Sequence, residues 1–125
     1  MRKLKLYIVD DSPYVRKSLV RVFKEIDNVE IIGDSANVKS AIKFLSDNQP
    51  DVCLLDYHLP DGTAVDLMKF SKQTNKRAIH IIISNFADEK MKRMMLNAGA
   101  DYFFDKSDEI DELTELIERL ALQMK

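Results

Sequence analysis

The sequence has little cysteine and histidine, with one cysteine and two histidines among its 125 residues. A single cysteine cannot form an intrachain disulfide, and no partner lies at a spacing that would complete a zinc site. Cys53 stands within an apolar run, where a small core residue is expected. The chain is therefore expected to be a protein of the reducing cytoplasm.

The sequence also lacks long apolar runs and a marked excess of acidic or basic residues. No apolar stretch approaches the length that spans a membrane, and the basic residues 1–5 lack the apolar core of a signal peptide. The net charge is -2, with acids and bases mixed along the chain, and no basic stripe indicates nucleic acid. Neither a membrane nor a nucleic acid is expected as a partner.

The length fits a single domain, residues 1–125, and no output domain is expected. Short apolar runs predict strands at 4–9, 29–34, 52–56, 79–83 and 102–104. Apolar residues at helical spacing predict helices at about 13–26, 38–47, 63–72, 88–97 and 108–124. Strict alternation predicts an α/β fold, with a parallel sheet, right-handed crossovers and helices on both faces. Glu30 and Gly33 make the second strand the expected edge strand.

Polar side chains follow four of these strands where each strand ends. They are Asp10 with Asp11, then Asp56, Ser84 and Lys106. Because the carboxyl ends of parallel strands share one edge of a sheet, these residues are expected to converge on Asp56. Three crowded carboxylates raise each other's pKa values, and a divalent cation relieves their repulsion. Mg²⁺ suits such a site because it prefers oxygen ligands from a few carboxylates and phosphate.

An aspartate can attack phosphorus itself and form an acyl phosphate. Phosphoryl transfer requires mainly positioning and neutralisation of charge, which Lys106 and the Ser84 hydroxyl could supply. No base lies at a spacing that would make Ser84 a nucleophile. The residues alone therefore predict a Mg²⁺-dependent aspartyl-phosphate site centred on Asp56.

Four pieces of the sequence carry a resemblance to a known family. They are Val9-Asp10-Asp11-Ser12, the stretch 54–62, Ser84, and the stretch 99–106. With these pieces in this order, the whole chain resembles the receiver domain of bacterial two-component response regulators, of the stand-alone chemotaxis type. The resemblance implies a flavodoxin-like (βα)5 fold, with a doubly wound five-stranded parallel sheet in the order 2-1-3-4-5.

The resemblance also implies a set of roles. Asp56 would accept a phosphoryl group from a phosphohistidine, and Asp10, Asp11, Asp56 and the backbone carbonyl of His58 would hold Mg²⁺. Lys106 would pair with the phosphoryl group. The implied donor is a sensor histidine kinase or a histidine phosphotransfer protein.

Two residues would transmit the signal according to the same resemblance. Ser84 would move to hydrogen-bond the phosphoryl group, and Phe103 would be the switch aromatic that turns inward as Ser84 moves. A downstream protein effector would then read the face formed by the fourth helix, the fifth strand and the fifth helix. The protein would be no enzyme beyond its own phosphotransfer and dephosphorylation.

The sequence departs from the family pattern at several positions. Ser107 stands where a proline in a cis bond is usual, and Phe103 replaces a frequent tyrosine. His58 and Phe86 occupy positions that flank the attacking water, so we hypothesise that they slow dephosphorylation. Two other functions stay open: a phosphatase with an aspartate nucleophile, and a degenerate receiver that binds proteins without phosphorylation. The phosphatase would need an acid at position 58 and a cap domain.

Overall fold

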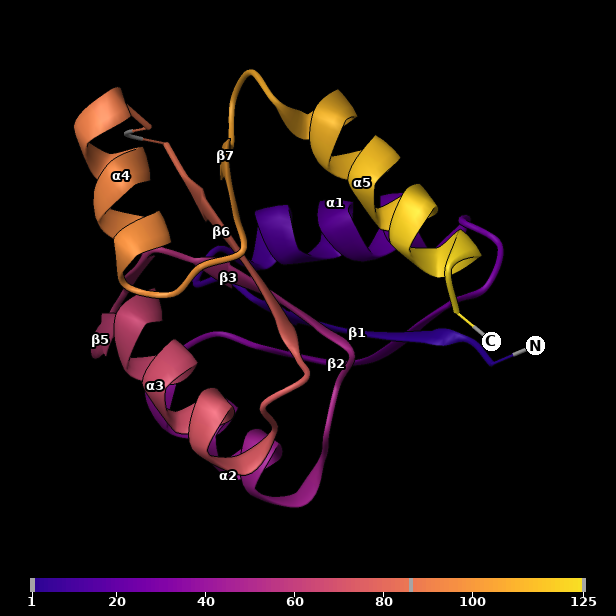
Figure 1. The fold of residues 1–125 in the computed structure, drawn as a ribbon, viewed down its shortest axis with the longest axis horizontal. Coiled ribbons are helices and arrows are strands. Elements are labelled where there is room, and N and C mark those ends of the chain that lie inside the picture. The colour runs from indigo at the N-terminus through magenta and orange to yellow at the C-terminus, as the bar shows by residue number, and fades with distance from the viewer. Residues whose placement is uncertain (1, 86, 125) are drawn as a thin grey trace.

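A five-stranded parallel sheet forms the centre of the protein (Figure 1). The computed structural model describes residues 2–85 and 87–124. The strand order is β2-β1-β3-β6-β7, and each neighbouring pair is parallel. The bounds are β1 (Leu4–Val9), β2 (Val29–Ser35), β3 (Val52–Asp56), β6 (Ile79–Ser84) and β7 (Tyr102–Asp105). Counted within this sheet alone, the order is the predicted 2-1-3-4-5, and the edge position of the second strand is confirmed.

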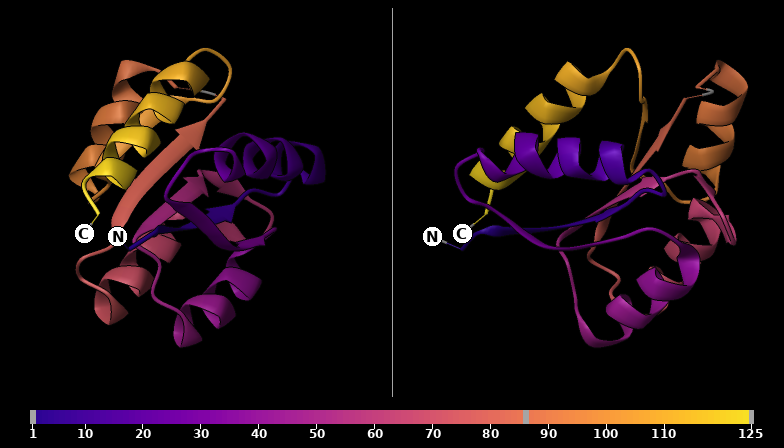
Figure 2. Two further views of the ribbon diagram at one scale, coloured as in Figure 1. Left: turned by 90° about the vertical axis from the view of Figure 1, so that its right-hand side faces the viewer. Right: turned by 180° about the vertical axis from the view of Figure 1, so that it is seen from behind.

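Helices cover both faces of the sheet, as the alternation predicted. Figure 1 shows α1 and α5 on one side and α2 and α3 on the other, and Figure 2 shows the two layers from further directions. The bounds are α1 (Pro13–Lys24), α2 (Val38–Asp47), α3 (Ala64–Thr74), α4 (Glu89–Asn97) and α5 (Ile110–Leu122). No helix in the described part of the chain is both long and apolar enough to cross a membrane.

The two core layers follow from the alternation of side chains along each strand. In β1, Leu6 and Ile8 pack with α1 and α5, while Tyr7 and Val9 pack with the helices of the other face. Every residue of β3 is buried, as expected for a central strand that helices cover on both faces. An apolar run therefore supplies both cores and ends in the buried carboxylate of Asp56.

The local signals at the helix ends are borne out. Ser12 caps α1, because its hydroxyl accepts a hydrogen bond from the backbone N–H of Val15, and Pro13 is the first helical residue. After α4, Gly99 adopts a φ of +116°, in the region that favours glycine. The Lys72 ammonium donates to the Gly99 carbonyl at 2.7 Å and so fixes this exit to α3.

The fold differs from the sequence predictions after β3 and before α5. A short antiparallel hairpin, β4 (His58–Leu59) with β5 (Gly62–Thr63), occupies what was expected to be a turn. Helix α5 begins two residues later than predicted, because Asp105 organises a turn first. Its Oδ1 accepts from the N–H of Ser107 at 2.7 Å and of Asp108 at 3.2 Å.

The bond before Ser107 is trans, as are all peptide bonds of residues 2–85 and 87–124. Proline has no N–H, so the usual family residue could not make the hydrogen bond that Ser107 donates to Asp105. Serine at this position therefore belongs to a different turn, and that turn leaves the Lys106 side chain directed at the sheet edge.

Candidate functional site

The carboxyl edge of the sheet brings together the polar residues that the sequence singled out. Asp10 follows β1, Asp56 ends β3, Ser84 ends β6 and Lys106 follows β7. Asp10, Asp56 and Ser84 are buried, whereas Asp11 is exposed. One carboxylate oxygen from each of Asp10, Asp11 and Asp56 lies within 4.8 Å of the other two.

Lys106 reaches two of these carboxylates at once. Its ammonium lies 2.6 Å from Oδ2 of Asp10 and 3.1 Å from Oδ2 of Asp56. Its backbone N–H donates to the Ser84 carbonyl at 2.9 Å, which fixes the start of the loop to β6. Burial alone would lower the pKa of Lys106, but the two carboxylates together raise it above its ordinary value. Lys106 is therefore a permanent cation beside Asp56.

One ammonium does not compensate three carboxylates. The pKa of Asp56 is raised to about 6, first by burial and next by the charge of Asp10, while Lys106 opposes the rise. The carboxylate of Asp56 is thus ionised at neutral pH at a cost in free energy, because it is desolvated and lies beside like charge. A further cation at this edge would be stabilising.

Asp10 is held by groups on three sides. Its Oδ1 accepts from the N–H of Ser12 at 2.9 Å, and its own N–H donates to the Ser35 carbonyl at 3.0 Å. Arg16 donates to the Asp10 carbonyl at 2.8 Å and pairs with Asp34 at 3.1 Å. Arg16 cannot be recognised as part of the site from the sequence, because a cation on an exposed helix carries no sign of a contact with a strand end.

The loop after Asp56 is fixed to its neighbours by backbone hydrogen bonds. The N–H of Tyr57 donates to the Ile83 carbonyl at 2.9 Å, and the N–H of Ala64 donates to the Tyr57 carbonyl at 3.1 Å. His58 pairs with Thr63 in the hairpin, and its exposed ring lies edge-on to Tyr57. Strand pairing with Thr63 therefore helps to set the position of the His58 backbone.

The other residues considered from the sequence lie as follows. Phe103 is buried with only 6% of its surface exposed, and it packs in the core layer that contains Met95 and Ala100. The ring of the expected switch residue is thus already inward in this structure. Phe86 lies outside the described residues.

The cysteine and the second histidine belong to the core rather than to the site. Burial raises the pKa of the Cys53 thiol to about 12. His80 is fully buried, with its Nε2 at 2.8 Å from the Ser71 hydroxyl, and burial lowers its pKa to about 4. Both side chains are neutral at pH 7, as structural residues in an apolar layer should be.

The donor set suits Mg²⁺ by its chemistry. Hard oxygen ligands, two of them buried and one exposed, gather where negative charge exceeds positive charge. The oxygens of an octahedral Mg²⁺ site lie roughly 3 to 4 Å apart, so small rotations of these side chains would bring them into range. The exposed Asp11 leaves one side open, which suits an ion that keeps several waters.

The fold and the site define the class of this protein: a flavodoxin-like α/β domain with an acidic cluster and a lysine at the carboxyl edge of its sheet. Residues 6–118 match the response regulator receiver domain family. The chain therefore belongs to that family, whose members accept a phosphoryl group on an aspartate as signalling modules.

Two known response regulators are similar to this chain. The nitrate/nitrite response regulator protein homolog of Haemophilus influenzae is 30% identical over 120 residues, which cover 95% of this chain and 57% of that protein. Response regulator protein PilR of Pseudomonas aeruginosa is 31% identical, over 94% of this chain and 26% of that protein. The chain thus spans between about a quarter and just over half of the length of these curated relatives.

A solved structure shows the likeness of fold. The response regulator domain of Thermotoga maritima CheB matches with a TM-score of 0.85 at 21% identity, and the match covers 99% of each chain. At this identity the match supports the arrangement of helices and strands and carries no residue roles. The roles of Asp56, Lys106, Ser84, Phe103 and the Mg²⁺ ligands stay predictions.

Proposed function

We propose that Asp56 accepts a phosphoryl group from a phosphohistidine on a sensor histidine kinase or a histidine phosphotransfer protein. The observation that carries this proposal is the meeting of three carboxylates with one lysine around Asp56. Mg²⁺ would be held by Asp10, Asp11, Asp56 and the backbone carbonyl of His58. When bound, it would neutralise charge on the phosphoryl oxygens.

The transfer would begin with Asp56 as an ionised carboxylate. One of its oxygens attacks phosphorus, the bond from phosphorus to the imidazole nitrogen breaks, and the imidazole leaves with the electron pair. Lys106 would then pair with an oxygen of the acyl phosphate, and the Ser84 hydroxyl would donate to another. Positioning and charge provide the catalysis, as in other phosphoryl transfers.

The signal would follow as a shift between two states of the Ser84 loop and Phe103. Phe103 is already inward here, so phosphorylation would stabilise an arrangement that the unmodified chain can adopt. The proposed reading face is α4 with β7 and α5, where Met94 and Tyr102 are 49% and 36% exposed. Methionine adapts its shape to a partner, which suits such a surface.

Incubation with acetyl phosphate and Mg²⁺ tests the chemistry directly. The intact mass is expected to rise by one phosphoryl group, and the Asp56→Asn variant should gain none. Omission of Mg²⁺ should prevent the gain in wild type. An equal gain in Asp56→Asn would place the phosphoryl group elsewhere. No gain in wild type would instead favour the phosphorylation-independent binding module.

The surface around Lys106 supports a proposal for where the phosphodonor docks. An apolar groove between α1 and α5 is lined by Tyr14, Leu19, Val22 and Ile110, and its lining includes Lys106. The Tyr14 side chain is 80% exposed and Val22 is 42% exposed. Large exposed apolar side chains grouped beside a reactive site suit a protein surface. The groove is therefore the proposed place for a helix of the donor.

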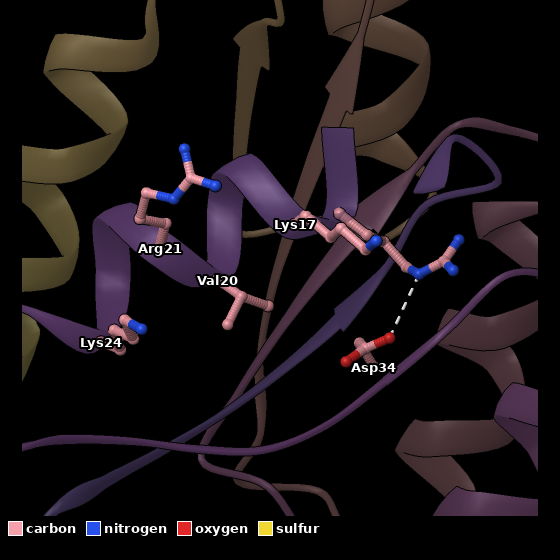
Figure 3. Close-up of a pocket in the computed structure, with 6 residues that line it drawn as sticks. Lys17, Val20, Arg21, Lys24 and Asp34 are labelled. Carbon is pink, nitrogen blue, oxygen red and sulfur yellow. Dashed lines mark hydrogen bonds and ion pairs between the residues drawn. The ribbon is translucent and has the colours of Figure 1, made fainter. Parts of the chain in front are cut away.

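Helix α1 also carries four cations and no acid. Figure 3 shows Lys17, Arg21 and Lys24 on this helix, with Asp34 in the same pocket. Asp34 pairs with Arg16 at 3.1 Å. None of these four cations has an acid on its own helix, and Arg16 is the one that pairs with Asp34 of β2. Complementary charge speeds the encounter of two proteins. We therefore expect the donor helix to carry acids beside its apolar residues.

Charge reversal on α1 gives a specific expectation. Lys17→Glu/Arg21→Glu should slow transfer from a phosphorylated histidine phosphotransfer domain with an acidic surface helix by about tenfold or more at low salt, because steering is lost. Phosphorylation by acetyl phosphate should be unchanged. Lys43→Glu/Lys69→Glu, on exposed positions of α2 and α3, is the matched control. Equal slowing in this control would remove α1 from the docking surface.

A further inference from the structure

Asp61, at the tip of the hairpin after Asp56, makes contacts that the site itself does not require. Its Oδ1 accepts from the N–H of Val38 at 2.7 Å, and its Oδ2 accepts from the N–H of Lys39 at 3.0 Å. These donors are the first two residues of α2, 23 and 22 positions earlier in the chain. A carboxylate is favoured there because it satisfies unpaired N–H groups at the positive end of the helix.

The hairpin also packs closely against α2 and α3 at Gly62. A Cβ atom on this residue would lie 3.0 Å from Cγ2 of Val38 and 2.7 Å from Oδ2 of Asp66. The Asp66 carboxylate accepts from the N–H of Thr63 at 3.2 Å, within the capping box of α3. The hairpin that carries His58 thus lies close to the amino termini of two helices, and the close approach favours glycine at position 62.

The segment that leads from β2 into α2 also contacts Asp10 of the acidic cluster. The Ser35 carbonyl, at the end of β2, accepts from the N–H of Asp10 at 3.0 Å. Only residues 36 and 37 separate Ser35 from α2. Residues 35–39 therefore contact two segments of the site: the end of β1, which carries Asp10, and the hairpin, which carries His58.

From these contacts we infer that Asp61 is a positioning residue: it fastens the hairpin to the amino terminus of α2, and this sets the affinity of the site for Mg²⁺. The inference rests on the proposed function, in which the His58 carbonyl and Asp10 face the same ion. Asp61 itself contacts neither the ion nor the phosphoryl group, and it acts through the backbone of the loop.

The physical reason is the strict geometry of Mg²⁺. The ion demands near-octahedral ligands at short distances, so a loop carbonyl contributes only if it is already in place. Without Asp61, the hairpin would have to be ordered when the ion binds, and this cost is subtracted from the binding free energy. Loss of groups that orient metal ligands typically weakens binding by about 10- to 100-fold.

Three variants test the inference, with Asn37→Ala as the matched control. Asn37 caps the same helix, because its side-chain oxygen accepts from the N–H of Ser40 at 2.8 Å. It bonds to no hairpin residue among the side-chain hydrogen bonds described for 2–85 and 87–124. Removal of such a cap costs about 1 kcal/mol of stability, so Asn37→Ala reproduces damage to α2 without release of the hairpin.

Isothermal titration with Mg²⁺ alone, well below the unfolding temperature, gives the readout. Asp61→Ala is expected to raise the Kd by about tenfold, and Asp61→Asn, which keeps one acceptor, should fall between it and wild type. Asn37→Ala should stay within about twofold of wild type. Hydrogen exchange of the N–H groups of 57–63 should quicken in Asp61→Ala and be unchanged in Asn37→Ala.

The outcomes separate the inference from the proposed function. If wild type binds Mg²⁺ and gains a phosphoryl group while Asp61→Ala binds as well as Asn37→Ala, Asp61 is no positioning residue and the proposed function stands. Equal weakening in both variants would assign the effect to α2 and overturn the inference as well. If wild type neither binds Mg²⁺ nor gains a phosphoryl group, both fail together.

Discussion

Asp56→Asn is expected to raise the free energy of unfolding by about 3 kcal/mol at pH 7 to 8, although it removes an ion pair. The pKa of Asp56 is about 6 in the folded protein, against an ordinary value of 3.8. A difference of about two pKa units corresponds to about 3 kcal/mol of unfavourable free energy in the ionised folded state. Asparagine resembles the neutral acid, so the penalty disappears in the variant.

The sign of this effect fixes its pH dependence. The folded state binds the Asp56 proton more tightly than the unfolded chain does, so the stabilising proton is fully bound below about pH 4. It is lost as the pH rises to about 6 and beyond. The difference in stability between Asp56→Asn and wild type should therefore be small near pH 4, grow through this window and level off above it.

Denaturant unfolding of both proteins from pH 4 to pH 8 measures this difference. Asp47→Asn, which changes an exposed aspartate at the last residue of α2, is the control and should show no such window. Mg²⁺ should stabilise wild type more than Asp56→Asn, because the ion binds the folded acidic cluster. A variant less stable than wild type at pH 7 would mean that ionisation of Asp56 carries no such free-energy penalty in the folded state.

Lys106→Met should have an effect of similar size in the opposite direction. Its ammonium lies 2.6 Å from Asp10 and 3.1 Å from Asp56, and the side chain is 9% exposed. Removal of one partner from a buried ion pair typically costs about 3 to 5 kcal/mol, because the remaining charge is uncompensated. Uptake of a proton by Asp56 limits the loss, so we expect about 3 kcal/mol at pH 8 and less at pH 5.

A double-mutant cycle identifies the cause of that loss. In the Asp56→Asn background one of the two paired carboxylates is already neutral and only the pair with Asp10 remains, so Lys106→Met should cost less than in wild type. Chemical denaturation of the four proteins at pH 8 gives the coupling free energy. An equal cost in both backgrounds would indicate that Asp56 does not contribute, and that the loss comes from the pair with Asp10 and from packing of the aliphatic part of Lys106.

Much of the fold follows from patterns that are local in the sequence. Apolar runs such as Val52–Asp56 belong to strands because both of their faces meet helices, and Pro13 and Gly99 mark helix ends through their own backbone geometry. The sequence also indicated that Asp10, Asp56, Ser84 and Lys106 share an edge, since parallel strands end together. These inferences need only the order of strands and helices.

Other features depend on contacts between segments far apart in the chain. Asp61 looked like a turn residue, yet its carboxylate caps a helix that begins 23 positions earlier. Arg16 looked like a surface cation, yet it donates to the Asp10 carbonyl. In each case the residue satisfies a backbone group, and such groups look alike in every sequence until the fold brings one within reach.

The sequence by itself thus determined the parallel sheet, its two helical layers and the acidic edge. The reason is that the spacing of apolar residues along the chain indicates each strand and helix without knowledge of any long-range contact. Only the tertiary structure decided that Phe103 points inward, that Lys106 bridges Asp10 and Asp56, and that the hairpin is pinned to α2. The reason is that side-chain direction and charge pairing depend on distances across the sheet, and these exist only once the strands have assembled.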